Sequence, residues 1–524
     1  MKYIVIVFFL MSTCLVFSQT DNEELKAANK QFEIGNYYGA LKIYNLLYLQ
    51  DVENKELNYS MGVCNYNIKE YKKAEQHFLK SNSSTNIELL RYKASIAHIN
   101  MEFNKALKYY NAYKLTSGNK ELSNEEVNAL VMKVKYAEIA VSDKRNVLIQ
   151  NVGSAINTAA DEYVPLISAD GRMLFFTSRR EGSTGGRLDP NGRPFEDVYM
   201  SISSNNVWMA PSSLTAVNTN GNDACVGLSA DGQSMLVFKP SKDLSSGNLY
   251  QSRMGLEDWG TPTKLSSEIN SEYTESSASI SLDDKILFFS SDRPGGFGGK
   301  DIYKVLRLPN GKWSRAFNLG PTVNTPYDED APFIHSDKKT LYFSSKGHSN
   351  MGGYDIFKTV YEKHRWSAPE NLKCPINTVL DDIFYVVSAN GKVGYYSSSR
   401  DGGYGGQDIY KVLLKDEFVS EHILQGIVLS KKGDLALLAK ITLIENESKT
   451  VKGVYESSNN TGSFIMLVNP KKTYSIIIES DDYHSYTADL DKQQFLLILK
   501  TILLLICKFS IPFFRHQILR RYCI

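Results

Sequence analysis

Residues 281–303 read Ser-Leu-Asp-Asp-Lys-Ile-Leu-Phe-Phe-Ser-Ser-Asp-Arg-Pro-Gly-Gly-Phe-Gly-Gly-Lys-Asp-Ile-Tyr, a pattern that occurs in five copies between residues 145 and 420. Each copy starts at a turn that contains Asp or Asn, followed by Gly in three copies. Such a pair suits a tight hairpin because its second residue must tolerate a positive φ. The turn residues are Asp170, Asp231, Asp283, Asp337 and Asn390.

Each copy has room for four short strands, since the turn residues are 52 to 61 positions apart. An apolar or aromatic pair follows each turn, and a later Asp/Asn-x-aromatic segment starts a third strand. Four copies then carry a tryptophan and an Asn-Thr or Asn-Ser pair, which we expect in the fourth strand and the link to the next copy. These residues are Trp208, Trp259, Trp313 and Trp366, and Asn218, Asn270, Asn324 and Asn377. Four strands per unit without a helical period predict a radial β-propeller.

The two ends of this array are complementary. The fifth copy has no tryptophan strand after Tyr410, whereas the segment before the first copy ends in Ile156-Asn157-Thr158, as the linking segments do. We therefore predict a five-bladed propeller over residues 145–420, with residues near 146–153 as the outermost strand of the last blade. Closure of this kind removes free sheet edges.

One column of the repeat is acidic in every copy, eight positions before the turn residue. Its members are Glu162, Asp223, Glu275, Glu329 and Asp382. The repeat geometry predicts a ring of carboxylates where the innermost strands begin, near one mouth of the central channel. Like charges in a ring repel one another, so each carboxylate needs a partner.

Two interpretations of these carboxylates stay open. In the first, they pair with backbone amides or with Arg180, Arg293 and Arg400, which lie ten positions after three of the turn residues. Ion-pair networks of this kind occur without any binding function. In the second, the carboxylates form a channel-mouth site for a cation or a basic peptide.

Residues 22–140 have a helical pattern, in which three segments repeat the order aromatic, two residues, Ala, three residues, aromatic. The segments are Tyr37-Ala40-Tyr44, Tyr71-Ala74-Phe78 and Phe103-Ala106-Tyr110. Their alanines are 34 and 32 residues apart, the period of tetratricopeptide repeats, in which a small residue lets two helices approach closely. Gly35 and Gly62 are expected at turns or close contacts, and the array is expected to present a concave surface to a peptide or protein.

The two ends of the chain carry further signals. Lys2 and the apolar run that follows it predict an export signal over residues 1–18, with cleavage before Gln19. Lipidation at Cys14 is the alternative, although residues 11–13 make a poor lipobox. Near the other end, alternating apolar residues over 422–490 predict the short strands of a small β-sandwich.

Composition and motifs exclude several classes of protein. Lys plus Arg (59) and Asp plus Glu (58) nearly balance, so no long-range field attracts nucleic acid. Beyond the leader, the cysteines are far apart and form no Cys-x-x-Cys pair, which argues against a zinc site and a disulfide scaffold. The chain has no Gly-x-Ser-x-Gly, His-Glu-x-x-His or P-loop motif. We expect no catalysis, no metal and no cofactor.

These motifs carry a family resemblance. The segments Phe288 to Arg293 and Gly405 to Tyr410 resemble the WD-type repeats of TolB-like propellers, and Gly426 to Tyr483 resembles a carboxypeptidase-regulatory-like domain. Signal, tetratricopeptide array, propeller and sandwich in this order are similar to the OmpA-family envelope proteins of Bacteroidetes, including PorE-like members of the type IX secretion apparatus. The resemblance covers residues 1–490 and implies a non-enzymatic periplasmic scaffold associated with the outer membrane, with envelope partners such as a PorP/SprF-like barrel.

The tail over residues 491–524 departs from that family. The family continues into an OmpA-like domain that binds peptidoglycan, whereas this tail has an apolar run broken by Lys500, Lys508 and Pro512. Lysines within a membrane span are costly, so a frameshifted or truncated product explains the tail better than a transmembrane helix. Peptidoglycan is therefore expected as a partner only if a longer form restores that domain. The competing functional hypothesis is a ligand-binding propeller that takes a glycan, a cation or a peptide at its channel mouth.

Overall fold

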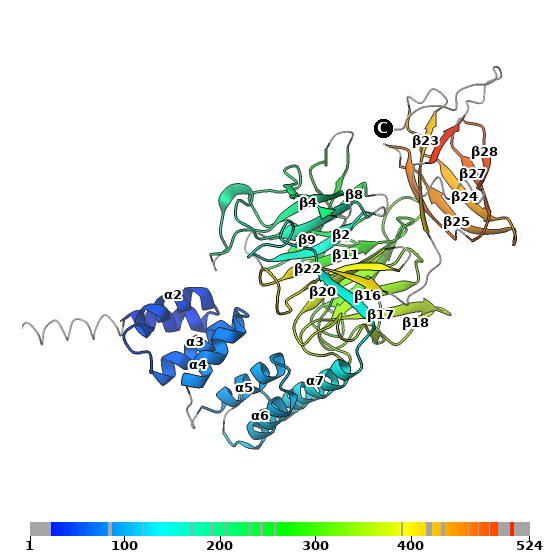
Figure 1. Ribbon diagram of the computed structural model, residues 1–524. Helices are drawn as coiled ribbons and strands as arrows, with labels where there is room; N and C mark the ends of the chain where they lie inside the picture. The colour runs from blue at the N-terminus through cyan, green and yellow to red at the C-terminus, as the bar shows by residue number, and fades with distance from the viewer. Residues whose placement is uncertain are drawn as a thin grey trace, which may run out of the picture.

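The computed structural model describes residues 23–490, except for 82–85, 119, 169–170, 190–191, 205–206, 230–231, 242–244, 256–257, 389–390, 415–421, 431–434, 459–460, 470 and 482, and adds the backbone of 503–507. The expected signal peptide, Cys14 and most of the tail lie outside the described residues. Helices occupy one end of the molecule, a set of antiparallel sheets its middle and further sheets the other end (Figure 1). No helix of the described part is long and apolar enough to span a membrane.

The helical part begins with a helix over residues 23–33 and continues with α2 (Tyr37–Tyr48), α3 (Lys55–Asn67), α4 (Tyr71–Lys80), α5 (Glu88–Ile99), α6 (Phe103–Leu115) and α7 (Asn124–Ser142). The three repeated alanines, Ala40, Ala74 and Ala106, are fully buried. A Cβ added at Gly62 would lie 2.6 Å from the Phe78 ring. Small residues therefore let neighbouring helices approach closely, as the 34-residue period predicted.

The described residues between 147 and 414 form five antiparallel sheets, one for each sequence repeat. The first contains β2 (Glu162–Ile167), β3 (Met173–Ser178), β4 (Asp197–Ser204), β5 (Val207–Trp208) and β6 (Ser212–Ser213). The second contains β7 (Ala224–Leu228), β8 (Ser234–Pro240), β9 (Gly247–Arg253) and β10 (Thr263–Lys264). The third contains β11 (Glu275–Ile280), β12 (Ile286–Ser291), β13 (Asp301–Leu306) and β14 (Phe317–Asn318). The fourth contains β15 (Glu329–Ile334), β16 (Thr340–Ser345), β17 (Asp355–Glu362), β18 (Arg365–Trp366) and β19 (Glu370–Asn371).

The fifth sheet joins the two ends of this region. It contains β20 (Asp382–Val387), β21 (Val393–Ser398), β22 (Asp408–Leu414) and, beside β22, the strand β1 (Val147–Asn151). β1 runs antiparallel to β22, from the pair Val147 and Leu414 to the pair Asn151 and Tyr410. The predicted pairing of residues near 146–153 with the last repeat is confirmed. The first strands β2, β7, β11, β15 and β20 contact one another in turn, and β20 contacts β2, which gives a propeller-like ring.

The outermost strands differ from the expectation in one respect. In the first four repeats they are two residues long, whereas β1 has five residues, and the tryptophans lie before these short strands, at the hairpin that leaves the third strand. Trp208 pairs with Ser203 and Trp366 with Tyr361, while Trp259 and Trp313 form isolated bridges to Met254 and Arg307. Trp208 and Trp366 therefore lie in the short strands β5 and β18, which pair with the third strand as expected, while Trp259 and Trp313 close the same hairpin through single bridges.

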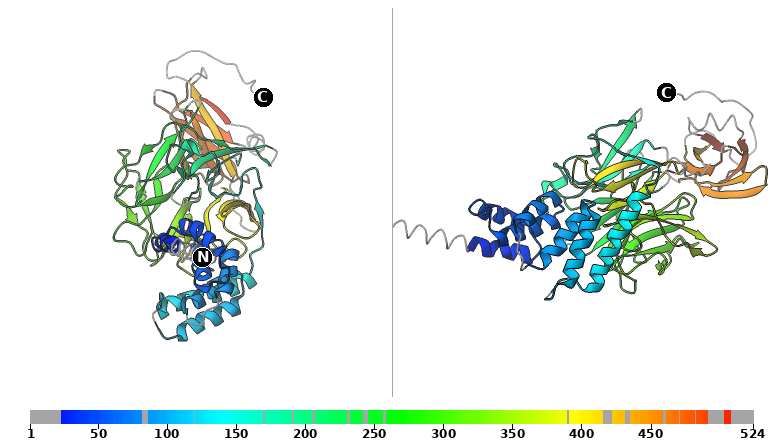
Figure 2. Two further views of the ribbon diagram at one scale, coloured as in Figure 1. Left: turned by 90° about the vertical axis from the view of Figure 1, so that its left-hand side faces the viewer. Right: turned by 60° about the horizontal axis from the view of Figure 1, so that its bottom comes forward.

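The helices pack against the loops of the sheets. α7 runs from the other helices to the sheets in both sets of views (Figures 1 and 2). Its Ala137 and Ala140 form a buried apolar cluster with Met351 and Val379 from the fourth repeat and its link to the fifth. The turns between paired helices also face this side: Lys69 Nζ lies 2.6 Å from Asp381 Oδ2.

The C-terminal part has two sheets that share one core. The first contains β23 (His422–Ser430), β26 (Ser463–Val468) and β29 (Leu503–Cys507). The second contains β24 (Lys440–Glu445), β25 (Thr450–Glu456), β27 (Tyr474–Glu479) and β28 (Tyr486–Leu490). Leu424, Val428, Ile441 and Ile476 are among the buried residues between them. The alternating pattern predicted strands in this region correctly, and the structure adds β25 and β28.

Candidate functional site

The five carboxylates of the acidic column are fully buried, at or just before the first residue of each innermost strand. Each accepts hydrogen bonds from the backbone N–H and the hydroxyl of a Thr or Ser four residues earlier. For Glu162 these bonds come from Thr158 N and Thr158 Oγ1, at 2.6 and 2.8 Å. The equivalent donors in the other repeats are Thr219, Ser271, Thr325 and Thr378. The carboxylate thus ties the linking segment to the strand that follows it.

Four of these carboxylates also have a cationic partner. Arg180, Arg293 and Arg400 donate to Glu162, Glu275 and Asp382 at 3.3, 2.9 and 3.3 Å, and Lys239 pairs with Asp223. The guanidinium groups also lie over aromatic rings of their own repeat, as Arg293 does over Phe289 and Tyr303. Burial raises the pKa of Glu162 and of Asp382, and the arginine opposes that effect.

The structure corrects the expected position at a channel mouth: Glu162, Asp223, Glu275, Glu329 and Asp382 are fully buried and form hydrogen bonds within their own repeats. None of them lines the central cavity, and no group of three or more possible ligands for a metal occurs among the residues that the structure describes. The geometry agrees with the pairing interpretation. Binding of a cation or a basic peptide by these side chains stays a prediction.

A second set of buried aspartates was not singled out from the sequence as functional. Asp197, Asp301, Asp355 and Asp408 begin the third strands of four repeats and are almost fully buried. Asp301 accepts hydrogen bonds from Phe297 N at 2.7 Å and from Asn318 Nδ2 at 2.6 Å, which fixes the glycine-rich loop against the outermost strand. The Asp-x-aromatic motif marks these aspartates in the sequence as strand starts, but it does not reveal the hydrogen bonds that they accept.

A cavity of about 410 Å³ lies among the innermost strands of all five repeats. Apolar side chains dominate its lining, including Leu166, Ile280 and Phe333. Polar residues in its lining include Lys411 and Ser336. This size falls in the usual range of small-ligand pockets, and such a lining suits an amphipathic guest. The sequence did not reveal the cavity, because it depends on how five separate strands converge.

Strained backbone borders this cavity. Val164, Ala331 and Phe384 occupy the same position in three repeats and have φ of 52°, 52° and 61°. Each lies in a β-bulge, where the pairing of the innermost strand with the second strand shifts. Left-handed backbone is costly for residues with a side chain and persists where packing enforces it, often at functional sites. The bulges make the cavity the strongest candidate for a binding site in the described region.

Comparison with known proteins finds only weak structural similarities. No protein-family model and no curated protein matches the chain. A TolB candidate from Agrobacterium tumefaciens is 16% identical with a TM-score of 0.30, over 61% of this chain and 95% of that chain. The β-propeller domain of the Trilobed protease from Pyrococcus furiosus is 11% identical with a TM-score of 0.25, over 64% and 98%. An alpha-L-arabinofuranosidase from Lactobacillus brevis is 11% identical with a TM-score of 0.32, over 52% and 93%. At these values the likenesses establish neither ancestry nor function.

Proposed function

We propose that the chain is a non-enzymatic scaffold of the bacterial envelope, built from a tetratricopeptide array, a closed five-bladed propeller and a small β-sandwich. The proposal extends to a periplasmic location at the outer membrane, a link to type IX secretion or gliding machinery, and a barrel protein of that membrane as partner. The organisation of the chain and the family resemblance of its sequence motifs support it. One structural observation carries it: the helical array is held on the sheets at several separate points.

Those points span the array. Tyr38, at the start of α2, lies against the guanidinium of Arg193, with 5.8 Å between the ring centroid and the guanidinium carbon. Lys69, in the turn between α3 and α4, pairs with Asp381. Phe103, the first residue of α6, packs against the apolar cluster that contains Met351. An array fixed in this way presents its remaining surface in a set orientation relative to the propeller-like ring, which is what a scaffold requires.

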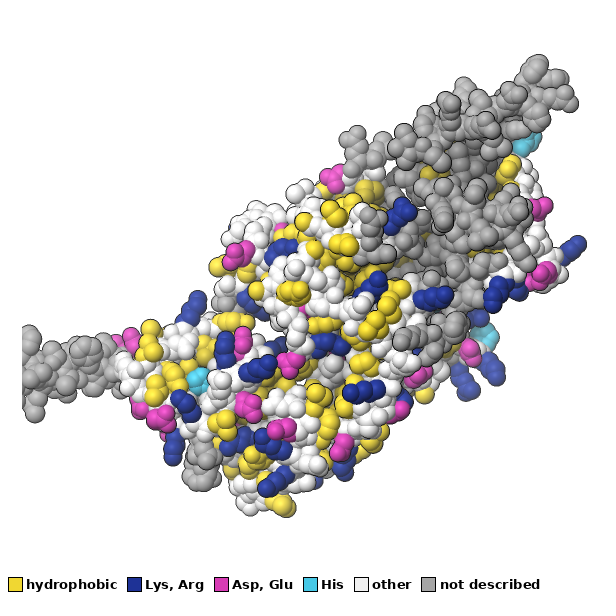
Figure 3. Space-filling model, in the orientation of Figure 1, with side chains coloured by type: hydrophobic (Ala, Val, Ile, Leu, Met, Phe, Trp, Pro, Cys, Tyr) yellow, Lys and Arg dark blue, Asp and Glu magenta, His cyan; other side chains and the backbone are white. Residues whose placement is uncertain are grey.

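The surface chemistry is compatible with protein partners. On the face drawn in Figure 3, positive and negative side chains are interspersed over the helices and the sheets, without a large field of one sign. Exposed apolar residues occur on both parts, among them Leu115 at 86% exposure on the helices and Val207 at 63% on the sheets. Mixed surfaces with separate apolar contacts suit protein interfaces better than a nucleic acid backbone.

The proposal is tested by crosslinking and affinity purification of the tagged full chain from an envelope fraction, followed by quantitative mass spectrometry. Recovery of an outer-membrane barrel supports the scaffold. A matched variant, Lys411→Ala, alters the cavity lining and leaves the array unchanged, so recovery of the same partner with this variant assigns binding to the other surfaces. Absence of any envelope partner above an untagged control contradicts the proposal.

A second candidate function rests on the cavity. Its volume and its mixed lining favour binding of a small amphipathic molecule or a peptide side chain at the centre of the ring. Retention of the purified protein on a glycan or peptide array, reduced by Lys411→Ala, supports this function. If both proteins show the same signal as the blank surface, this candidate fails and the scaffold is unaffected.

A further inference from the structure

The fourth repeat differs from the other four at its buried carboxylate. Its counterpart of Arg180, Arg293 and Arg400 is Gly347, followed by His348. His348 Nε2 lies 2.9 Å from Val323 O, the carbonyl equivalent to Ile156 O, to which Arg180 donates. The imidazole thus takes over the arginine's contact with the linking segment. No described cation forms an ion pair with the carboxylate of this repeat, Glu329, in contrast to the four pairs elsewhere.

Glu329 is held by neutral donors alone. Thr325 N, Thr325 Oγ1 and Ser345 Oγ each lie 2.6 Å from one of its oxygens. Its side chain is fully buried, and this burial raises its pKa to about 7, with a smaller contribution from the charge of Asp301. The ordinary pKa of a glutamate lies far lower, so this carboxyl group takes up a proton near neutral pH only while its surroundings stay closed.

The same hydroxyl that binds Glu329 also holds a loop. Gly347 N donates to Ser345 Oγ at 2.9 Å, at the start of the segment 346–353. This segment holds α7: Lys133 Nζ donates to Lys346 O at 3.1 Å and to Gly352 O at 3.0 Å, and Met351 packs on Ala137 and Ala140. A continuous path of contacts therefore leads from Glu329 through Ser345 and the loop to the last helix of the array.

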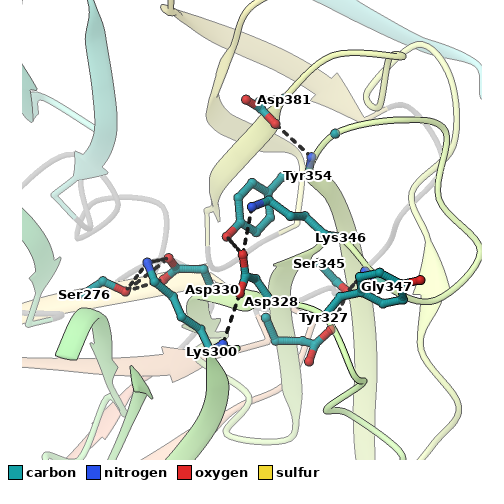
Figure 4. Close-up of polar contacts among 12 residues, drawn as sticks. Ser276, Lys300, Tyr327, Asp328, Asp330, Ser345, Lys346, Gly347, Tyr354 and Asp381 are labelled. Carbon is teal, nitrogen blue, oxygen red and sulfur yellow. Dashed lines mark hydrogen bonds and ion pairs between the residues drawn. The ribbon is translucent and has the colours of Figure 1, made fainter. Parts of the chain in front are cut away.

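Other charged groups surround this loop, and their partners are fixed (Figure 4). Asp328 accepts from Lys346 Nζ at 2.8 Å and from Tyr354 OH at 3.3 Å. In the neighbouring network Lys300 pairs with Asp330, and Asp381 accepts from Tyr354 N.

Further titratable groups lie on α7 or close to it. Burial lowers the pKa of Lys133, the α7 side chain that donates to the loop. Burial lowers the pKa of His98 to about 4, so its imidazole is neutral at pH 6 and above. Burial raises the pKa of Asp355 far above its usual range, and Asn371 and Met351 N donate to that carboxyl group. Burial lowers the pKa of His348 as well, so that imidazole is neutral when Glu329 ionises.

We propose that the fourth repeat is an attachment site for the helical array and that protonation of Glu329 controls it. With Glu329 protonated, the closed loop 346–353 holds α7; with Glu329 ionised, a buried charge without a cation strains the loop and α7 dissociates from it more often. The first, third and fifth repeats lack this response because an arginine neutralises the carboxylate. The proposal is independent of the scaffold function, since it concerns only how the array is attached.

Hydrogen exchange of the full-length protein measures the opening directly. After correction for intrinsic exchange rates, α7 and residues 346–353 should open about tenfold more often at pH 8 than at pH 6. Linkage predicts this ratio because the pKa of Glu329 falls to its ordinary value when the loop opens. Glu329→Gln should abolish this difference. Glu275→Gln, in a repeat that retains Arg293, should leave the response of α7 unchanged.

A second variant keeps the test valid if Glu329→Gln fails to fold. His348→Arg supplies the cation of the other repeats and should make α7 protection independent of pH between 6 and 8. Equal opening of α7 at both pH values in the native protein would overturn the proposal. A pH response that persists in a folded Glu329→Gln protein would also overturn it.

Discussion

Asn151 donates a hydrogen bond from Nδ2 to Asp408 Oδ2 at 2.8 Å, and this bond joins the start of the propeller-like region to its end. The same bond occurs inside continuous repeats, between Asn318 and Asp301 at 2.6 Å and between Asn371 and Asp355 at 2.7 Å. β1 therefore takes the place of the outermost strand in the fifth sheet in side-chain detail as well as in backbone pairing.

Replacing Asn151 should loosen this junction. Asn151→Ala removes the donor to Asp408 and an acceptor for Gly153 N and Asn157, so we expect a loss of about 2 kcal/mol in unfolding free energy. Hydrogen exchange should increase in both β1 and β22. Asn318→Ala, the matched control, should increase exchange within the third repeat only. Unchanged hydrogen exchange in β22 of the Asn151→Ala variant would contradict the conclusion that Asn151 joins β1 to β22.

Glycine at position 405 should be indispensable. A Cβ there would lie 1.9 Å from Ala160 O, which is backbone and cannot move aside, so Gly405→Ala should lower the melting temperature by several degrees. Gly221→Ala is the control, because its Cβ would meet only Thr219 Oγ1 at 3.5 Å and its φ is ordinary. Equal melting temperatures for the two variants would contradict the close approach of the fifth repeat to the first link.

The stability of the fourth repeat should fall as pH rises. The folded-state pKa of Glu329 is about 7, above that of an unfolded glutamate, so its favourable contribution is complete below pH 4.5 and is lost as pH rises through 7. Glu329→Gln should therefore be more stable than the native protein at pH 8, by about 2 kcal/mol, and no more stable at pH 4.5. Thermal melts across this range measure the difference. Glu275→Gln should be destabilised at pH 8, because it leaves Arg293 without its partner.

The helical repeats should reject a larger residue at their central alanine. Ala74 is fully buried in α4, so Ala74→Leu should cost about 1 to 3 kcal/mol through overpacking against the neighbouring helix. Lys73→Leu places the same side chain at the adjacent position, where Lys73 is 62% exposed, and should change stability little. Circular dichroism melts of both variants provide the comparison. Similar losses for the two would contradict close helix contact at Ala74.

Most of the fold could be predicted because it repeats. Ala40, Ala74 and Ala106 report helix contacts at a fixed period, and the Asp-Gly and Asp-x-aromatic motifs report turns and strand starts. The pairing of β1 with β22 followed from one orphan strand and one missing strand. The outermost strands of the first four repeats were less predictable, since two-residue strands have no hydrophobic period of their own.

The site was harder to predict because its chemistry depends on side-chain direction. The acidic column was visible, but burial of these carboxylates follows from bonds to the Thr or Ser four residues earlier, a constant spacing that could have revealed it. Lys239 and His348 replace the arginine at positions shifted along the chain, so alignment by spacing missed them. The cavity and its bulges arise only when five strands meet.

One engineered disulfide tests the ring closure on which the other assignments depend. Gln150 and Lys411 are directly paired between β1 and β22, and directly opposed residues of antiparallel strands are close enough for a disulfide. The variant Gln150→Cys/Lys411→Cys should oxidise to an intramolecular bond, identified by peptide mass spectrometry, and should melt at a higher temperature than its reduced form. The control Gln150→Cys/Leu413→Cys, displaced by two residues, should not form it efficiently. No bond in the first variant, or preferential bonding in the second, would contradict closure in the observed register.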